Sequence, residues 1–258
     1  LKDAASGAIY GARAANGVIL VTTKQGKIGK VTTSYDGSIG WQNMTRIPKQ
    51  LTAKQYMDIQ DMTNINDGKA PHDWAAFIPA DILAAYQDGS NPGTDWLEML
   101  RNKNAVTTSH SLNVTGGSEL SKFSTGIGYQ YQDGIIGGSL APSDFRRFTF
   151  RLNSEHILLK KGDRNVITFG ENVYYQHREN KGIQIGNMYS NAIYSMLHTA
   201  PIIPAFNPDG SLFTGNDGAA NGWNLLGINQ YLGNPLNALL HSEHSQNKRR
   251  SHNLHATA

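Results

Sequence analysis

Apolar and polar residues alternate with a period of two along several stretches of the chain, which is the pattern of strands whose two faces meet different surroundings. Over residues 122–132 the odd positions hold Phe, Thr, Ile, Tyr and Tyr, and the even positions hold Lys, Ser, Gly, Gly, Gln and Gln. The pattern predicts five strands, at residues 31–41, 105–115, 122–132, 145–156 and 165–176, and a sixth that begins near Leu239 and continues past Leu254.

The lengths of these strands and of their connections favour a membrane barrel. Each strand has about ten residues or more, close to the roughly 9–11 that a transmembrane strand needs, whereas ordinary globular strands have about 5–6. Short connections at 116–119 and 159–163 alternate with long ones at 42–104, 133–144 and 177–238. Outer-membrane barrels have this asymmetry, with short periplasmic turns and longer extracellular loops.

The long connections contain signals for helices. Thr52 and Gln55 occupy the two ends of a capping box, and apolar residues follow them at helical spacing. Further helices are predicted over residues 95–100 and 185–197. We therefore expect extracellular loops that contain helical segments.

Composition is compatible with a barrel but does not decide the fold. Hydrophobic residues make up 39% of the chain and charged residues 17%, below the roughly 45–50% and 25% of soluble domains. Transmembrane barrels have this profile because only every second strand residue must be apolar, although soluble β-rich secreted proteins share it. The longest apolar runs, such as Val18–Val21, are far shorter than the about 20 residues of a spanning helix. Because the chain starts at Leu1 and stops at Ala258 within an alternating stretch, we expect a fragment of a longer protein.

Charge and cysteine content exclude several classes of site. The net charge is +3 and the pI is near 9, but the only dense basic cluster is Lys248–Arg250. We assign this cluster to a solvated loop or a barrel interior, and expect no nucleic-acid partner. The chain has no Cys, so it has no disulfide, thiol nucleophile or Cys-based zinc site.

Several polar residues resemble metal or catalytic groups only superficially. Two pairs of histidines are three positions apart, which in a strand places the members of each pair on opposite faces. Ser195 and His198 lack an acid partner and a nucleophile elbow. Residues 64–68 resemble a calcium loop, but Ala75 stands where Glu is required. We predict no metal, no cofactor and no enzymatic activity. The histidine pairs are His241 with His244 and His252 with His255.

The first 27 residues combine a short helix of small residues, a tight turn at Asn16–Gly17 and a β-rich run at Val18–Lys24. This stretch closely resembles the end of the plug domain in SusC/RagA-type TonB-dependent outer-membrane transporters. The residues that carry the resemblance are Ala8, Ile9, Tyr10, Gly11, Arg13, Ala14, Ala15, Asn16, Gly17, Val18, Ile19, Thr22, Thr23 and Lys24.

A second block is similar to the early barrel strands of the same family. The resemblance implies a mainly β fold: the C-terminal end of a plug domain at 1–26, and the N-terminal part of a large antiparallel transmembrane β-barrel at 27–258. About six strands of about 22 would lie in this chain. The second block comprises Gly116–Ser118, Tyr129–Gln132, Gly134–Ile135, Arg147 and Arg151–Asn153, with Asp95–Trp96 ahead of it.

The resemblance also implies a function. Members of the family import large nutrients, glycan fragments or peptides, across the outer membrane of Gram-negative bacteria. They act with a SusD-type surface lipoprotein that closes over the barrel as a lid, and TonB supplies energy through a segment ahead of the plug. The expected surroundings of the strands are outer-membrane lipid.

Two groups of residues are candidates for functional sites. In the plug motif, Arg13 can form a charged hydrogen bond inside a polar lumen, either as a packing ion pair or as part of plug movement. Tyr10, Gly11, Asn16 and Gly17 complete this motif. Three tryptophans in the long loops are candidate ligand or lid contacts, although loop-core packing is an equally common role. They are Trp74, Trp96 and Trp223.

The alternative hypothesis is a soluble or surface β-rich binding module, such as an adhesin. Such a module would pack the apolar strand faces onto a second sheet and would dissolve in water. The transporter hypothesis predicts that the same faces meet lipid, with Tyr35, Trp41, Tyr129 and Tyr131 contributing to an interfacial aromatic girdle.

Overall fold

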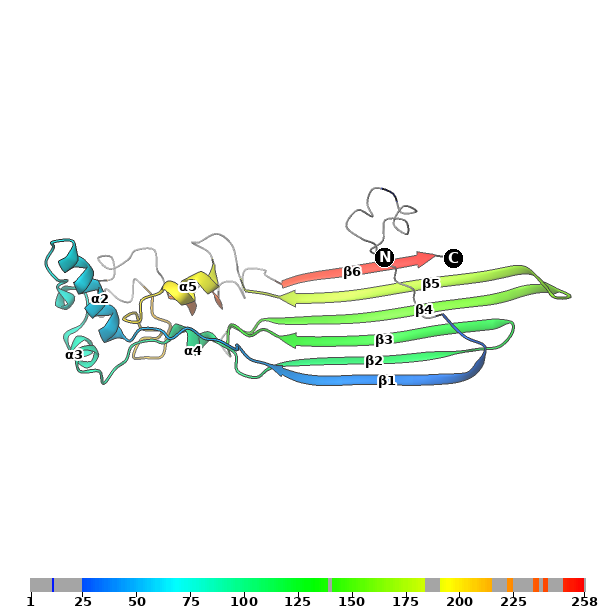
Figure 1. Ribbon diagram of the computed structural model, residues 1–258, viewed down its shortest axis with the longest axis horizontal. Helices are drawn as coiled ribbons and strands as arrows, with labels where there is room; N and C mark the ends of the chain where they lie inside the picture. The colour runs from blue at the N-terminus through cyan, green and yellow to red at the C-terminus, as the bar shows by residue number, and fades with distance from the viewer. Residues whose placement is uncertain are drawn as a thin grey trace.

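The computed structural model shows a long six-stranded sheet with a helical layer beyond one of its ends (Figure 1). We call this layer, formed by the long connections between strands, the loop cap. The residues that the structure describes are 11, 25–138, 141–183, 191–214, 222–224, 234–236, 239–240 and 248–257.

All six strands are antiparallel to their neighbours and follow one another in chain order. The five predicted strands are confirmed, and all five are longer than predicted. The last of them extends to Lys181 because its final residues pair with strands on both sides, Asp144 on one and Lys248 on the other. The strands are β1 (Gly29–Gln42), β2 (Ala105–Gly117), β3 (Ser121–Asp133), β4 (Asp144–Lys161), β5 (Arg164–Lys181) and β6 (Lys248–Thr257).

The predicted start of the sixth strand was wrong. β6 begins at Lys248, whereas Leu239 is 1% exposed and belongs to the hydrophobic core of the loop cap. An isolated apolar pair at 239–240 fits a buried strand or a buried loop equally well, so the alternation alone could not place this boundary.

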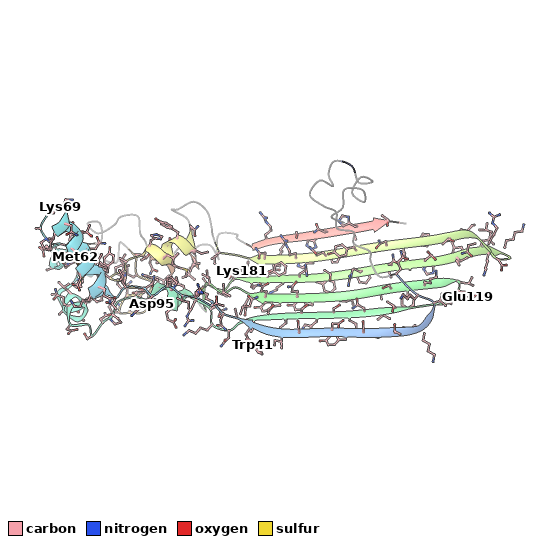
Figure 2. All side chains as sticks on the ribbon, viewed as in Figure 1. Trp41, Met62, Lys69, Asp95, Glu119 and Lys181 are labelled. Atoms are coloured by element: carbon pink, nitrogen blue, oxygen red, sulfur yellow. The ribbon has the colours of Figure 1, made fainter. Side chains whose placement is uncertain are left out.

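Short turns gather at one end of the sheet and long connections at the other, as predicted. The β2–β3 turn is closed by a hydrogen bond from Ser118 N to Ser121 O at 2.6 Å. In the β4–β5 turn Gly162 has φ +59°, a left-handed conformation that favours glycine. Figure 2 shows Glu119 at the turn end and Trp41 and Lys181 at the end near the loop cap.

Helices in the loop cap begin at recognisable caps. The predicted capping box is present, because Gln55 N donates to Thr52 Oγ1 at 3.2 Å and Thr52 N donates to Gln55 Oε1 at 3.0 Å. Asp95 Oδ1 accepts from Glu98 N at 2.9 Å and caps α4. The helix α3 was not predicted. The helical elements are α2 (Ala53–Asn66), η2 (Trp74–Ala76), α3 (Ala80–Asp88), α4 (Trp96–Leu100) and α5 (Ala192–His198).

The predicted helix over 185–197 is confirmed only in its second half. The segment α5 starts at Ala192 and continues to His198, and residues 184–190 lie outside the described part of the chain. Asn191 caps this helix, since its Oδ1 accepts from Tyr194 N at 3.0 Å.

The hydrophobic core lies in the loop cap and not in the sheet. Among the described residues, Ala105 is the only buried hydrophobic residue that belongs to a strand. Hydrogen bonds join separate loops inside this core: Trp96 Nε1 donates to Ala200 O at 3.4 Å, and Tyr86 OH donates to Ile202 O at 3.1 Å. The largest fully buried side chains are Trp96, Ile78, Leu100, Met196, Ile202, Leu236 and Leu239.

We expect Trp96→Ala to lower the free energy of unfolding of the loop cap by about 3–5 kcal/mol, because it leaves a cavity where a fully buried indole stands. Trp41→Ala is the matched control, since Trp41 lies on β1 and is 61% exposed. Hydrogen exchange of the α4 and α5 amides measures the effect. Equal exchange rates in the two variants would show that the loops do not share one core.

Candidate functional site

One face of the sheet is apolar and uncovered. The pairing register aligns one apolar side chain from each of the six strands in a single row. The end members of this row are largely exposed, Tyr35 by 63% and Leu254 by 67%. Among the described residues, no element packs over this row, so a broad apolar surface faces outward. The row is Tyr35, Leu112, Ile127, Phe150, Tyr175 and Leu254.

Towards the loop cap, this apolar face gives way to a charged border. Arg146 Nε lies 3.0 Å from Asp144 Oδ1, and Arg250 Nε lies 3.3 Å from Glu179 Oε2. The guanidinium of Arg146 also sits 5.6 Å from the centre of the Tyr131 ring. Tyr131, Arg146, Glu179 and Arg250 are register partners, so the apolar face ends on the side of the loop cap in one row of paired charged side chains and an aromatic ring.

Polar groups within the apolar face are paired with one another. The Tyr35 hydroxyl and His110 Nδ1 are hydrogen-bonded at 2.7 Å, and the Tyr175 hydroxyl and His252 Nδ1 at 2.9 Å. The register places His252 opposite His177 on this face and His255 opposite Tyr174 on the other. This confirms that His252 and His255 cannot share a metal ion.

The opposite face of the sheet is polar. Its central row has small or polar side chains on every strand, and the two adjacent rows carry arginines on β4 and β5. We call the two surfaces the apolar face and the polar face. The central polar row is Asp36, Ser111, Gly128, Thr149, Gln176 and Asn253.

The segment ahead of β1 crosses the polar face near the turn end of the sheet. A Cβ placed on Gly26 would lie 2.4 Å from Phe123 N and 2.8 Å from Lys122 C, so only glycine allows this approach. A cavity of about 210 Å³ lies between this segment and the strands, lined by polar-face residues that include Lys122, Glu155 and Asn172. The sequence patterns did not predict this contact with β3.

The three candidate tryptophans pack inside the loop cap. Trp74, Trp96 and Trp223 are 8%, 0% and 5% exposed, respectively. Trp223 meets Phe213 edge-on, with ring centres 5.6 Å apart. In this conformation the three indoles serve the core, and contact with a ligand or a lid stays a prediction.

Asp61 anchors the segment that carries Trp74. Burial raises the pKa of Asp61, but hydrogen bonds from His72 N at 2.8 Å and from Trp74 Nε1 at 3.0 Å outweigh it, with help from the His72 side chain. The pKa of this carboxyl is therefore lower than its ordinary value. The neighbouring residues 64–68 end α2 and turn at Gly68, as expected for a turn.

An open cavity of about 500 Å³ lies at the side of the loop cap. Its walls include Tyr86, Asn91, Glu98 and Phe206. Burial raises the pKa of Tyr86 to about 12, so its hydroxyl stays a donor, here to Ile202 O. Phe206, which is 37% exposed, offers aromatic surface, and Asn91 and Glu98 offer hydrogen-bonding groups, which together suit a polar ligand or another protein surface.

Most of the predicted plug motif lies outside the described residues, namely Tyr10, Arg13, Asn16 and Gly17. Gly11 is described, and its φ of +70° is a conformation that favours glycine. Within the described part of the chain, no group of three or more His, Cys, Asp or Glu is arranged to hold a metal ion. Nor is any described helix long and apolar enough to cross a membrane.

Comparison with known proteins decides the family. The TonB-dependent receptor SusC of Bacteroides thetaiotaomicron is 30% identical over 217 residues, which cover 83% of this chain and 19% of the receptor. The TonB-dependent receptor P39 of Formosa agariphila is 32% identical over 197 residues, which cover 75% of this chain and 17% of that receptor. The chain belongs to the SusC/RagA-type TonB-dependent transporters. This SusC/RagA-type chain thus spans about a fifth of the length of the curated relatives it matches. No family model matches it.

Solved structures show the fold of this SusC/RagA-type chain. The RagAB peptide importer in its open-open state superposes with a TM-score of 0.62 at 24% identity, over 83% of this chain and 25% of that chain. The closed-closed state of the same importer superposes with a TM-score of 0.60 at 23% identity. The predicted fold class is confirmed: the sheet is part of a large antiparallel barrel, with helices in the long connections.

Acid should loosen the loop cap around Asp61. Because the pKa of Asp61 is lower in the folded protein than in the unfolded chain, its stabilising contribution is present above the unfolded value of about 3.9 and is lost as the pH falls through the folded value. We expect hydrogen exchange of η2 amides, corrected for intrinsic rate, to rise as the pH falls below about 4.

The variant Asp61→Asn separates this effect from the effects of other carboxylates, such as Glu98. Hydrogen bonds from Arg101 and Lys103 lower the pKa of Glu98 to about 2. The variant should already exchange faster at pH 6, and should lose the part of the pH dependence that Asp61 causes. An unchanged pH profile in Asp61→Asn would rule out this carboxylate as the anchor.

Proposed function

We propose that this chain supplies the end of the plug domain, residues 1–26, and the first barrel strands, residues 27–258, of an importer in the outer membrane of a Gram-negative bacterium. The importer carries a large nutrient inward, and TonB drives it. The observation that carries the proposal is the six-stranded sheet with an uncovered apolar face and a polar opposite face.

The apolar face suits lipid. Burial of apolar surface contributes roughly 25 cal/mol per Å², and a water-soluble module would bury such a face against a second sheet. In the described residues the helices lie beyond the end of the sheet and leave this face free (Figure 1). The alternative of a soluble binding module leaves the apolar face without a role.

The polar face suits a hydrated lumen that holds the plug. The connector at Gln25–Ile28 reaches the polar face at the turn end, where a plug inside the barrel would join β1. Short turns then lie on the periplasmic side, and the loop cap lies outside the cell. In the plug motif, Arg13 would form a packing ion pair or take part in plug movement.

The cargo belongs to one of two classes, glycan fragments or peptides. SusC and the RagAB peptide importer stand among the relatives and structural neighbours, and a SusD-type lipoprotein would close over the loop cap as a lid. Trp74, Trp96 and Trp223, with the cavity beside Tyr86, are the candidate contacts for cargo or lid. Import by this route needs no covalent step.

Uptake should depend on TonB. In cells whose only importer for a labelled nutrient is the complete transporter, we expect removal of TonB or collapse of the proton gradient to abolish uptake while surface binding persists. Labelled oligosaccharides and labelled peptides, tested separately, assign the cargo class. Uptake that continues at the same rate without TonB contradicts the proposal.

A further inference from the structure

Four arginines cluster on the polar face in the half of the sheet nearer the loop cap. Arg147 and Arg151 stand on β4, two rows apart. Arg178 stands on β5 and Arg249 on β6. We call these four residues the arginine patch.

The patch contains an unfavourable pairing. Arg147 and Arg178 are direct partners in the β4–β5 register, and side chains in such positions have Cβ atoms about 4.5–5.5 Å apart. Like charges directly opposite one another destabilise a sheet. The stability of the sheet therefore does not explain why two arginines occupy these paired positions.

Within the described residues, no carboxylate neutralises the patch. Arg147 Nη2 donates to Gln130 Oε1 at 2.7 Å and Arg151 Nη2 donates to Asn113 Oδ1 at 3.4 Å, both neutral acceptors. Arg178 has neither a hydrogen bond nor an ion pair to any residue in the described ranges.

The acids of the polar face lie elsewhere. Glu155 pairs with Lys122 at 3.1 Å near the turn end. Asp36 stands on β1, three strands away from β4, which corresponds to about 14 Å. Neither carboxylate can reach Arg178.

The same sheet provides an internal comparison. On the apolar face, Arg146 and Arg250 each have a carboxylate within 3.3 Å. Arg147 and Arg249, their immediate neighbours in the chain, have none among the described residues. Unpaired guanidinium groups are therefore a property of the polar face and not of arginines in this sheet generally.

A hollow adjoins the patch. It measures about 290 Å³, and its walls include Gly128, Gln130, Arg147, Arg151 and Tyr174. A Cβ on Gly128 would approach Thr149 Oγ1 to 2.6 Å, so glycine keeps the floor of the hollow open. Two guanidinium groups thus border a space that a small anionic group can enter, with polar amide and hydroxyl groups beside it.

We propose that the arginine patch binds an oxyanion group, a carboxylate, sulfate or phosphate, carried by the imported substrate. The inference rests on the proposed function, because it takes the polar face as the lumen. Guanidinium groups hold such oxyanions through paired, charge-assisted hydrogen bonds. A concave lumen with charge of one sign also concentrates ligands of the opposite sign. The transporter therefore selects acidic cargo over neutral cargo of the same size.

The test uses the complete transporter, purified in detergent, and the fluorescent trisulfonate pyranine as the anionic probe. Fluorescence anisotropy gives its affinity, and sodium sulfate is compared with sodium chloride as competitor at equal ionic strength. We expect Arg178→Gln to weaken pyranine binding about tenfold or more, the effect of losing a charged hydrogen bond.

Arg164→Gln is the matched control, because Arg164 lies on the same strand at its turn end and the variant loses the same charge. It should bind pyranine like the unaltered protein. Arg147→Gln is a second variant in the patch, in case Arg178→Gln fails to fold. Sulfate should displace the probe at concentrations where chloride does not.

If the patch variants and Arg164→Gln bind pyranine with equal affinity, the bound probe is an adventitious ion only, and the inference is overturned. A second result would also overturn it: the unaltered transporter binds no pyranine, and Arg178→Gln lowers the unfolding temperature of the transporter. Together these observations would mean that a carboxylate of the protein itself fills the patch. TonB-dependent uptake of the native nutrient, measured in parallel, keeps the two proposals apart. If uptake needs TonB but the patch binds no anion, only this inference fails.

Discussion

The alternation of side chains along an antiparallel strand is the constraint from which the rest of this structure follows. Each strand presents alternate residues to opposite faces, and the register carries this division across all six strands without a slip in the central rows. The row from Tyr35 to Leu254 is apolar on every strand, and the next row on the other face, from Asp36 to Asn253, is polar or small on every strand. A shift of one residue in any pair would mix the two faces.

The two parts of the chain are therefore stabilised in different ways. The loop cap buries its own core, in which Trp96 and Ile78 from the β1–β2 connection and Met196 from the β5–β6 connection are almost fully buried. The sheet has backbone ladders and cross-strand pairs but almost no buried apolar side chains among the described residues. Its stability depends on what covers the apolar face. In the proposed transporter a bilayer would supply that cover without a second protein layer, and the charged border at Arg146 and Arg250 would mark where it ends.

Sequence patterns predicted the sheet well because a period of two is a strong local signal. Boundaries that depend on distant contacts were less predictable: β5 extends to Lys181 through pairing with two neighbours, and Leu239 is buried by the loop cap instead of starting a strand. The helix α3 has a proline before it and Gly89 after it, signals that could have located it. The site was harder to predict. The contact of Gly26 with β3 and the pairing of Arg147 with Arg178 join residues far apart in the chain, and only the register brings them together.

The central claim, that one face of the sheet meets lipid and the other a hydrated lumen, is tested most directly by site-directed spin labelling along β2. This chain contains no cysteine, so single cysteines are introduced at each position from Ser109 to Thr115, and any cysteine in the rest of the complete transporter is first replaced by serine. In the complete transporter in bilayers, we expect labels at 110, 112 and 114 to collide preferentially with molecular oxygen, which partitions into lipid. Labels at 109, 111, 113 and 115 should collide preferentially with a water-soluble nickel chelate. Accessibility without a period of two, or preference for the nickel chelate at every position, would contradict the account.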